Sequence, residues 1–335
     1  MQAGSISKID SITTSYQLRA MELIGDDAKT SDSFPLPQSH PWLLFYQNKQ
    51  GTQYSITQQR HYKIDCSIMY NKYEKAHACK DGWMVLHDSD DTFDVILFNV
   101  YSQERRQLPK LKSVTRLAYL SSSPHDPSCY VVLIQKHGDF DMFFNFCKIG
   151  GEHAFVKQLC RNSVIQSFTS FGGNLYGLKK YSTTLVRVEF NDQSAHFEEV
   201  IGGDLFNEPS SRPKWTGLYA IGYITENCGE ILLVTKIYFA KRHWQVENIR
   251  VFRADLCARK WVEMESIGER TIFLGSVGGI FCINSNNANV RKNCIYFIEE
   301  NDRNIYVFDL EDMSVSINLP CPHVGKKSII SRWIL

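Results

Sequence analysis

The stretch that decides the fold runs from Cys294 to Ile317. It reads CIYFI at 294–298, EENDRN at 299–304, IYVFDL at 305–310 and, after a polar corner, VSI at 315–317. Runs of β-branched and aromatic residues bounded by Asn, Asp and Ser are typical of short strands joined by tight turns. Three such runs in succession predict an antiparallel β-meander.

The same unit recurs along the chain. Earlier copies begin near Trp42, Trp83, Tyr130, Leu175 and Ile231. Their spacing of roughly 40–65 residues overlaps the propeller repeats of about 40–50 residues, if the excess lies in loops. Separate meanders would expose their edges, and a radial arrangement protects the edges while burying both faces of each sheet. We therefore predict an all-β chain folded as a β-propeller of six or seven blades, each an antiparallel four-stranded meander; a β-sandwich or a pair of sandwiches stays open, because it fits the strand spacing too.

The domain organisation follows from a change in composition near Pro35. Residues 1–34 are rich in Ser, Thr, Asp and Gln, and only 16–24 has the pattern of an amphipathic helix. We expect 1–34 to be a poorly ordered tail with a short helix. Strand-and-turn patterning fills the remainder, so we expect 35–335 to form one propeller domain.

Composition narrows the class of partner and the compartment. The chain has 37 Lys+Arg against 36 Asp+Glu, so no long-range field favours nucleic acid or an anionic membrane. No apolar run approaches the roughly 18 residues that span a bilayer, and the N-terminus lacks the pattern of a signal peptide. The ten cysteines include no Cys-x-x-Cys pair, and several lie in apolar runs. We expect reduced thiols and a cytoplasmic or nuclear protein.

A second set of motifs carries a resemblance to a known family. The C-terminal set comprises Leu256, Trp261, Gly268-Glu269, Phe273-Leu274-Gly275, Asn293 to Phe297 and Val307 to Leu310. The upstream set comprises Gly82 to Leu86, Leu97 to Asn99 and Gln107 to Pro109. Together they resemble the plant F-box-associated propellers of the KIB type, which are kelch-like. Val100 stands where that family commonly has proline.

The resemblance implies a protein-binding function. In complete members of the family the propeller selects proteins for ubiquitination, and a preceding F-box docks onto the adaptor of a cullin ubiquitin ligase. No F-box is recognisable here, because the Leu36-Pro37 dipeptide leads directly into the first predicted blade. The expectation is a propeller-only member that lacks the usual route to the adaptor. It would be a partner-binding module that works without a ligase, or a decayed relative with no retained role.

The candidate binding residues lie in one predicted hairpin tip. Lys241, Arg242, His243 and Trp244 combine basic and aromatic side chains between two apolar strands. Such residues often contribute most to a protein interface, although a solvated tip that protects an outer edge would show the same pattern. The turns 121–128 and 284–291 are the next candidates.

No catalytic, cofactor-binding or metal-ligating residue is predicted. The acidic turn 87–91 lacks the Gly and terminal Glu of a calcium loop, and His77 with Cys79 fits no zinc spacing. Gly172-Gly173 lacks the Lys-Ser/Thr of a phosphate loop and predicts a tight turn. We therefore predict a non-enzymatic protein-interaction propeller without cofactor; the alternative is a small-molecule binder or enzyme that uses the central channel.

Overall fold

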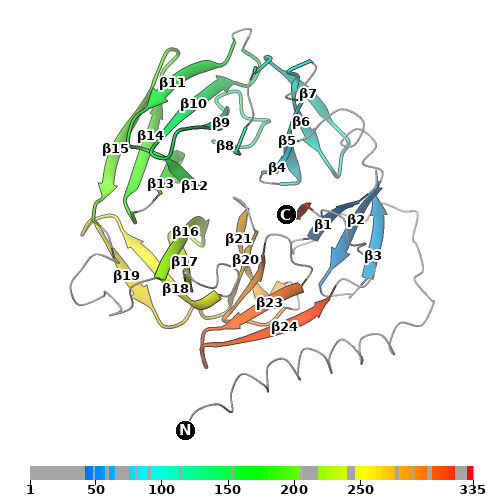
Figure 1. Cartoon of the computed structure of the whole chain (residues 1–335), viewed down its shortest axis with the longest axis vertical. Helices are drawn as coiled ribbons and strands as arrows, with labels where there is room; N and C mark the ends of the chain where they lie inside the picture. Colours follow the sequence, from blue (N-terminus) through cyan, green and yellow to red (C-terminus); the bar gives the residue numbers. More distant parts are fainter. Residues whose placement is uncertain are drawn as a thin grey trace.

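The computed structural model shows strands arranged in a ring (Figure 1). The residues that it describes are 42–47, 50–56, 60–64, 75–79, 81–88, 92–112, 115–151, 154–180, 182–203, 205, 218–239, 246–275, 279–287, 290–299, 304–320 and 330–334. The described strands form six sheets, and each sheet consists mainly of strands that follow one another in the sequence. The sheets are numbered in chain order.

Sheets 1 to 3 cover the first half of the ring. Sheet 1 has the order β25 (Ile330–Ile334), β1 (Trp42–Gln47), β2 (Gln50–Ser55) and β3 (Arg60–Ile64). Sheet 2 consists of β4 (Lys75–Ala78), β5 (Trp83–His87), β6 (Val95–Asn99) and β7 (Arg105–Leu108). Sheet 3 consists of β8 (Leu117–Leu120), β9 (Tyr130–His137), β10 (Asp141–Lys148) and β11 (Val156–Cys160).

Sheets 4 to 6 complete the ring. Sheet 4 consists of β12 (Ile165–Phe171), β13 (Asn174–Lys179), β14 (Leu185–Phe190) and β15 (Ala195–Ile201). Sheet 5 consists of β16 (Leu218–Asn227), β17 (Glu230–Phe239), β18 (Val246–Asp255) and β19 (Lys260–Met264). Sheet 6 has the order β21 (Ile280–Asn284), β20 (Arg270–Leu274), β22 (Cys294–Ile298), β23 (Asn304–Asp309) and β24 (Ser314–Pro320), and the 3-10 turn η1 (Ser285–Asn287) follows β21.

The chain is an all-β propeller, but the prediction of six or seven blades of four-stranded antiparallel meanders is wrong. In the described part of the chain five blades have that form. Sheet 6 differs because it has five strands, with β20 pairing in parallel with β22 through Ile272↔Ile295. The hairpin β20–β21 occupies the inner side of sheet 6, and the chain then crosses back to start β22 beside β20.

The two ends of the described chain meet in sheet 1. The last strand, β25, pairs antiparallel with the first, β1, and places Leu43 opposite Trp333. Because this pairing joins residues at opposite ends of the sequence, it completes sheet 1 and closes the ring. In Figure 1, β4, β8, β12, β16 and β21 lie toward the centre, whereas β19 and β24 lie at the outer rim.

The core consists of apolar layers between neighbouring sheets. Strands β5, β6 and β22 are buried along their whole length, which is expected of strands covered on both faces. Trp261 belongs to the cluster between sheets 4 and 5, and its indole Nε1 donates a hydrogen bond to the Thr183 carbonyl at 2.7 Å. Trp261 therefore packs between two blades.

Two glycine positions explain local sequence choices. Gly172 and Gly173 have φ of 56° and 76° and form the β12–β13 turn, as predicted. Gly82 has φ of 73°, and a Cβ there would lie 2.3 Å from the Tyr101 ring. Only glycine therefore fits before Trp83 in the Gly-Trp motif. No helix in the described residues is long and apolar enough to cross a bilayer.

Candidate functional site

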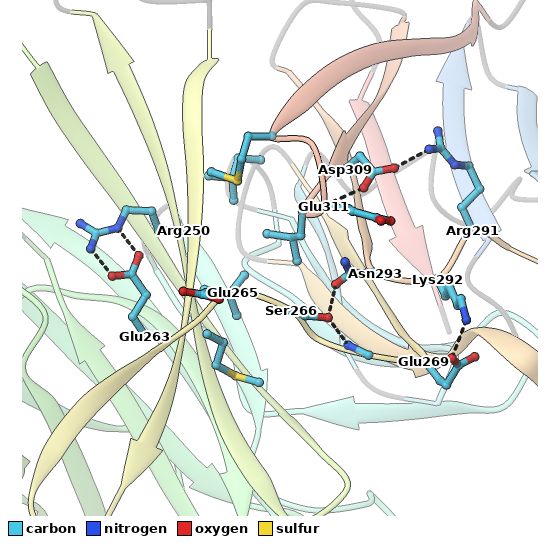
Figure 2. Close-up of a pocket in the computed structure, with 16 residues that line it drawn as sticks. Arg250, Glu263, Glu265, Ser266, Glu269, Arg291, Lys292, Asn293, Asp309 and Glu311 are labelled. Atoms are coloured by element: carbon cyan, nitrogen blue, oxygen red, sulfur yellow. Dashed lines mark hydrogen bonds and ion pairs between the residues drawn. The ribbon is translucent and has the colours of Figure 1, made fainter.

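A groove with a volume of about 900 Å³ lies between sheets 5 and 6 (Figure 2). One wall comes from the outer strands β18 and β19 and from residues 265–269 that follow them. The opposite wall comes from residues 291–293 before β22 and from the β23–β24 turn. The groove therefore lies where the end of β19, the start of β22 and the β23–β24 turn come together between sheets 5 and 6.

The floor of the groove is apolar. Ile249 and Val251 in β18 are fully buried, and they belong to one cluster with Leu310, against which Met264 packs. Met313 lines the groove at its exposed end, where half of its surface is accessible. The floor is thus the outer surface of the core layer that holds sheets 5 and 6 together, and its shape is fixed by that packing.

Two ion pairs line the groove, and a third, Arg250 with Glu263, lies on the face of sheet 5 turned toward sheet 4, where Arg250 lies over the Phe252 ring (Figure 2). Arg250 and Glu263 form a two-point pair across β18 and β19, with Nε to Oε1 at 2.6 Å and Nη2 to Oε2 at 2.5 Å. The two further pairs are Lys292 with Glu269 at 2.8 Å and Arg291 with Asp309 at 2.5 Å. The Lys292–Glu269 pair crosses from one wall to the other, whereas Arg291 and Asp309 belong to the same wall (Figure 2).

The pairing moves pKa values away from neutrality. Hydrogen bonds from Arg250 lower the pKa of Glu263, and the hydrogen bond from Lys292 lowers the pKa of Glu269. The same contacts raise the pKa of Arg250 and of Lys292. All four groups therefore carry full charge at pH 7, which suits recognition of a charged ligand; proton transfer instead favours a pKa near the working pH.

Asn293 fixes the position of one wall against the other. Its side-chain Oδ1 accepts hydrogen bonds from Ser266 Oγ and from the Ile267 amide, both at 2.9 Å. Its own backbone has φ of 55°, a region that asparagine adopts more readily than most residues. This residue ties the segment after sheet 5 to the start of β22, so the width of the groove is set before any ligand arrives.

The groove carries a net negative charge. Four carboxylates line it, from Glu265, Glu269, Asp309 and Glu311, against the two cations Arg291 and Lys292, so the excess is two negative charges. Each cation has a carboxylate partner, whereas neither Glu265 nor Glu311 forms an ion pair with a described residue. Both side chains are exposed, and Figure 2 places Glu265 on the sheet 5 side and Glu311 on the sheet 6 side.

The predicted binding residues are not in this groove as far as the structure describes them. Lys241, Arg242, His243 and Trp244 lie outside the described residues, so the hairpin tip stays a prediction. The turn 284–291 contributes Arg291 to the groove, whereas no residue of 121–128 lines it. Sequence reasoning missed the other groove residues because their charges alternate with core positions along ordinary strands; the one available signal was Asn293, which opens the Asn-x-Ile-Tyr-Phe motif.

Two residues at the start of the acidic segment 87–91 are buried, and residues 89–91 lie outside the described residues. These two are His87 and Asp88, and His87 Nε2 lies 2.8 Å from the Leu111 carbonyl oxygen. Asp88 accepts a hydrogen bond from the Thr92 hydroxyl at 2.8 Å, so its carboxylate stabilises the turn. The described residues contain no group of three His, Cys, Asp or Glu side chains placed to hold a metal ion.

Comparison with known proteins places the chain in a family. Comparison with curated proteins gave no match. A solved chain described as YCF48 bound to D1 peptide aligns with 91% of this chain and 97% of its own length, at 10% identity and a TM-score of 0.37. The model of the KIB1-4 β-propeller matches residues 53–309, from β2 to the end of β23. The chain belongs to the KIB1-4 β-propeller family.

Proposed function

We propose that this propeller is a non-enzymatic protein-interaction module and that the groove between sheets 5 and 6 is part of its binding surface. The observation that carries the proposal is the fixed charge of the groove. Hydrogen bonding between Lys292 and Glu269 shifts both pKa values away from neutrality, and Glu265, Asp309 and Glu311 add further carboxylates to the walls. Preformed, fully charged side chains around an apolar floor give orientation and specificity to a bound partner.

Family membership supports a more specific role. In complete F-box relatives the propeller selects substrates for a cullin ubiquitin ligase, and we propose substrate-like recognition of a protein partner in the cytoplasm or nucleus. The described residues form sheets, the segments that join them and one 3-10 turn, and no F-box is recognisable in the sequence. We propose that the propeller binds its partner without contacting the adaptor itself, and that it uses no cofactor.

Site-specific photocrosslinking tests the proposal. A benzoylphenylalanine at Met313, which is 50% exposed in the groove, should crosslink reproducibly to one or a few proteins in native extract. The matched control is the same residue at Phe140, which is 63% exposed in the β9–β10 turn of sheet 3. Crosslinks from Met313 and not from Phe140 are expected.

The same experiment contradicts the proposal if neither position yields a protein crosslink, or if both yield the same proteins in the same amounts. A cullin adaptor crosslinked to Met313 would contradict the narrower statement that the propeller does not contact the adaptor.

A further inference from the structure

The groove also indicates what kind of partner segment it accepts, an inference that rests on the proposed function. We infer that it binds an extended segment of a partner protein in which lysine or arginine alternates with apolar residues. The argument uses the charge balance of the walls, the apolar floor and the character of the neighbouring outer strand.

The charge balance selects for cations. The cations of the groove, Arg291 and Lys292, already have carboxylate partners, so an acidic segment would have to break a salt bridge to gain one. A basic segment can bind Glu265 or Glu311 without breaking a salt bridge, because neither carboxylate is paired with a described cation. The two residues lie on opposite walls of the groove (Figure 2). A basic side chain between them would be attracted by both carboxylates, and the excess of two negative charges would also speed its approach.

The apolar floor favours a segment in which apolar residues alternate with basic ones. Met264, Leu310 and Met313 border the groove over buried Ile249 and Val251. In an extended chain successive side chains point to opposite sides, so every second residue can face this floor while the residues between them reach the charged walls. Methionine side chains adapt their shape to different apolar partners, which suits a site that accepts more than one sequence.

The outer strand beside the groove extends the apolar surface. Val315 and Ile317 lie on one face of β24, where they are 44% and 49% exposed. Val315 is two residues after Met313 in the sequence. Outer strands normally carry charges that discourage pairing, and β3, β7, β11, β15 and β19 each contain Lys, Arg or Glu. The seven residues of β24 contain no charge. A partner segment leaving the groove therefore meets an uncharged strand edge.

Binding of synthetic peptides to the full chain tests the inference. The probes are fluorescent, acetylated and amidated ten-residue peptides in which lysine alternates with leucine or valine, with matched peptides that carry glutamate for lysine. Fluorescence polarisation should show at least about tenfold tighter binding of the lysine peptides, and the difference should shrink as salt is raised.

Charge-reversal variants locate the site. Glu265→Lys with Glu311→Lys should weaken binding of the lysine peptides by about tenfold or more. The matched control, Asp139→Lys with Asp192→Lys, makes the same change in net charge at exposed turns of sheets 3 and 4 and should leave the affinity within about twofold. All four sites are exposed, so the variants should fold; a thermal melt checks this.

Equal binding of the lysine and glutamate peptides, binding of neither, or the same loss in both double variants would overturn the inference. These outcomes leave the proposed function standing, because that proposal is judged by the crosslinks from Met313. Crosslinked native partners whose contact segments are acidic would likewise overturn the inference while supporting a protein-binding role.

Discussion

Replacing Glu299 by Gln should destabilise the propeller through one buried charge. Lys236 in β17 is only 1% exposed, and its Nζ lies 3.0 Å from Glu299 Oε1, just beyond the end of β22. The hydroxyl of Tyr238 also donates to this carboxylate, at 3.2 Å from Oε1. The ring centres of Tyr223 and Phe297 both lie 5.5 Å from the ammonium. The pair joins sheets 5 and 6, between which the groove lies.

The size of the loss follows from the burial of Lys236. Burial alone would lower the pKa of this lysine, but Tyr223, Tyr238 and Glu299 outweigh burial and raise it. Without Glu299 the ammonium lacks a full counter-charge, and removing one partner of a buried pair typically costs about 3–5 kcal/mol. Lysine can escape by losing its proton, which at pH 7 costs about 5 kcal/mol, and this sets the upper limit. We expect the Glu299→Gln variant to lose about 3–5 kcal/mol.

Urea unfolding followed by tryptophan fluorescence measures this loss. The double variant Lys236→Met with Glu299→Gln should recover most of the lost stability, because the uncompensated charge is gone. The control variant Asp139→Asn removes the exposed partner of Lys136 and should change stability by no more than about 0.5 kcal/mol. A loss below about 1 kcal/mol for Glu299→Gln, or no recovery in the double variant, would refute the reasoning.

Three further predictions concern packing, pH and thiols. Trp261→Ala should cost about 3–5 kcal/mol in urea unfolding, because it empties a buried aromatic site and leaves the Thr183 carbonyl without the indole donor; a change below about 1 kcal/mol would contradict inter-blade packing. Stability should fall as pH rises above about 10, since the folded pKa values of Lys236 and Tyr238 lie above their ordinary values of 10.5 and 10.0, so the folded state holds protons that the unfolded state releases. Urea midpoints measured over a series of alkaline pH values check this. The Lys236→Met variant should lose stability less steeply with pH than the wild type. Equal slopes in the two proteins would argue against Lys236 as a source of the pH dependence. At pH 8, iodoacetamide should modify the exposed Cys228 and Cys257 in the native protein, whereas burial raises the pKa of Cys147 and of Cys282 to about 12 and should protect both until the chain unfolds. Peptide mass spectrometry distinguishes these sites, and native labelling of Cys147 as fast as that of Cys228 would be the contrary result.

The architecture could be predicted because each blade is locally encoded. Alternating apolar runs and polar turns give the meanders, and the burial of Trp261 follows from its size and from the family motif. The irregular sheet 6 could not be predicted in this way. The parallel pairing of β20 with β22 depends on contacts between Thr271–Leu274 and Cys294–Phe297, and the pattern within either strand does not specify its neighbour.

The groove was missed for a related physical reason. Its charged residues come from four separate segments, and each charge is an ordinary exposed position on its own strand or turn. Only the packing of sheet 5 against sheet 6 brings Glu265 and Glu311 to facing walls (Figure 2). The buried Lys236 was equally hidden, because a lysine within an apolar strand reveals no partner until Glu299 is placed beside it.

The central claim is that the groove between sheets 5 and 6 holds a protein partner. Hydrogen–deuterium exchange of the full chain, with and without the native partner identified by crosslinking, tests it most directly. We predict slower exchange on binding in residues 263–269 and 309–317, with no change in residues 137–141 at the matched turn of sheet 3. Protection confined to other turns of the ring, with residues 263–269 and 309–317 unchanged, would contradict the account.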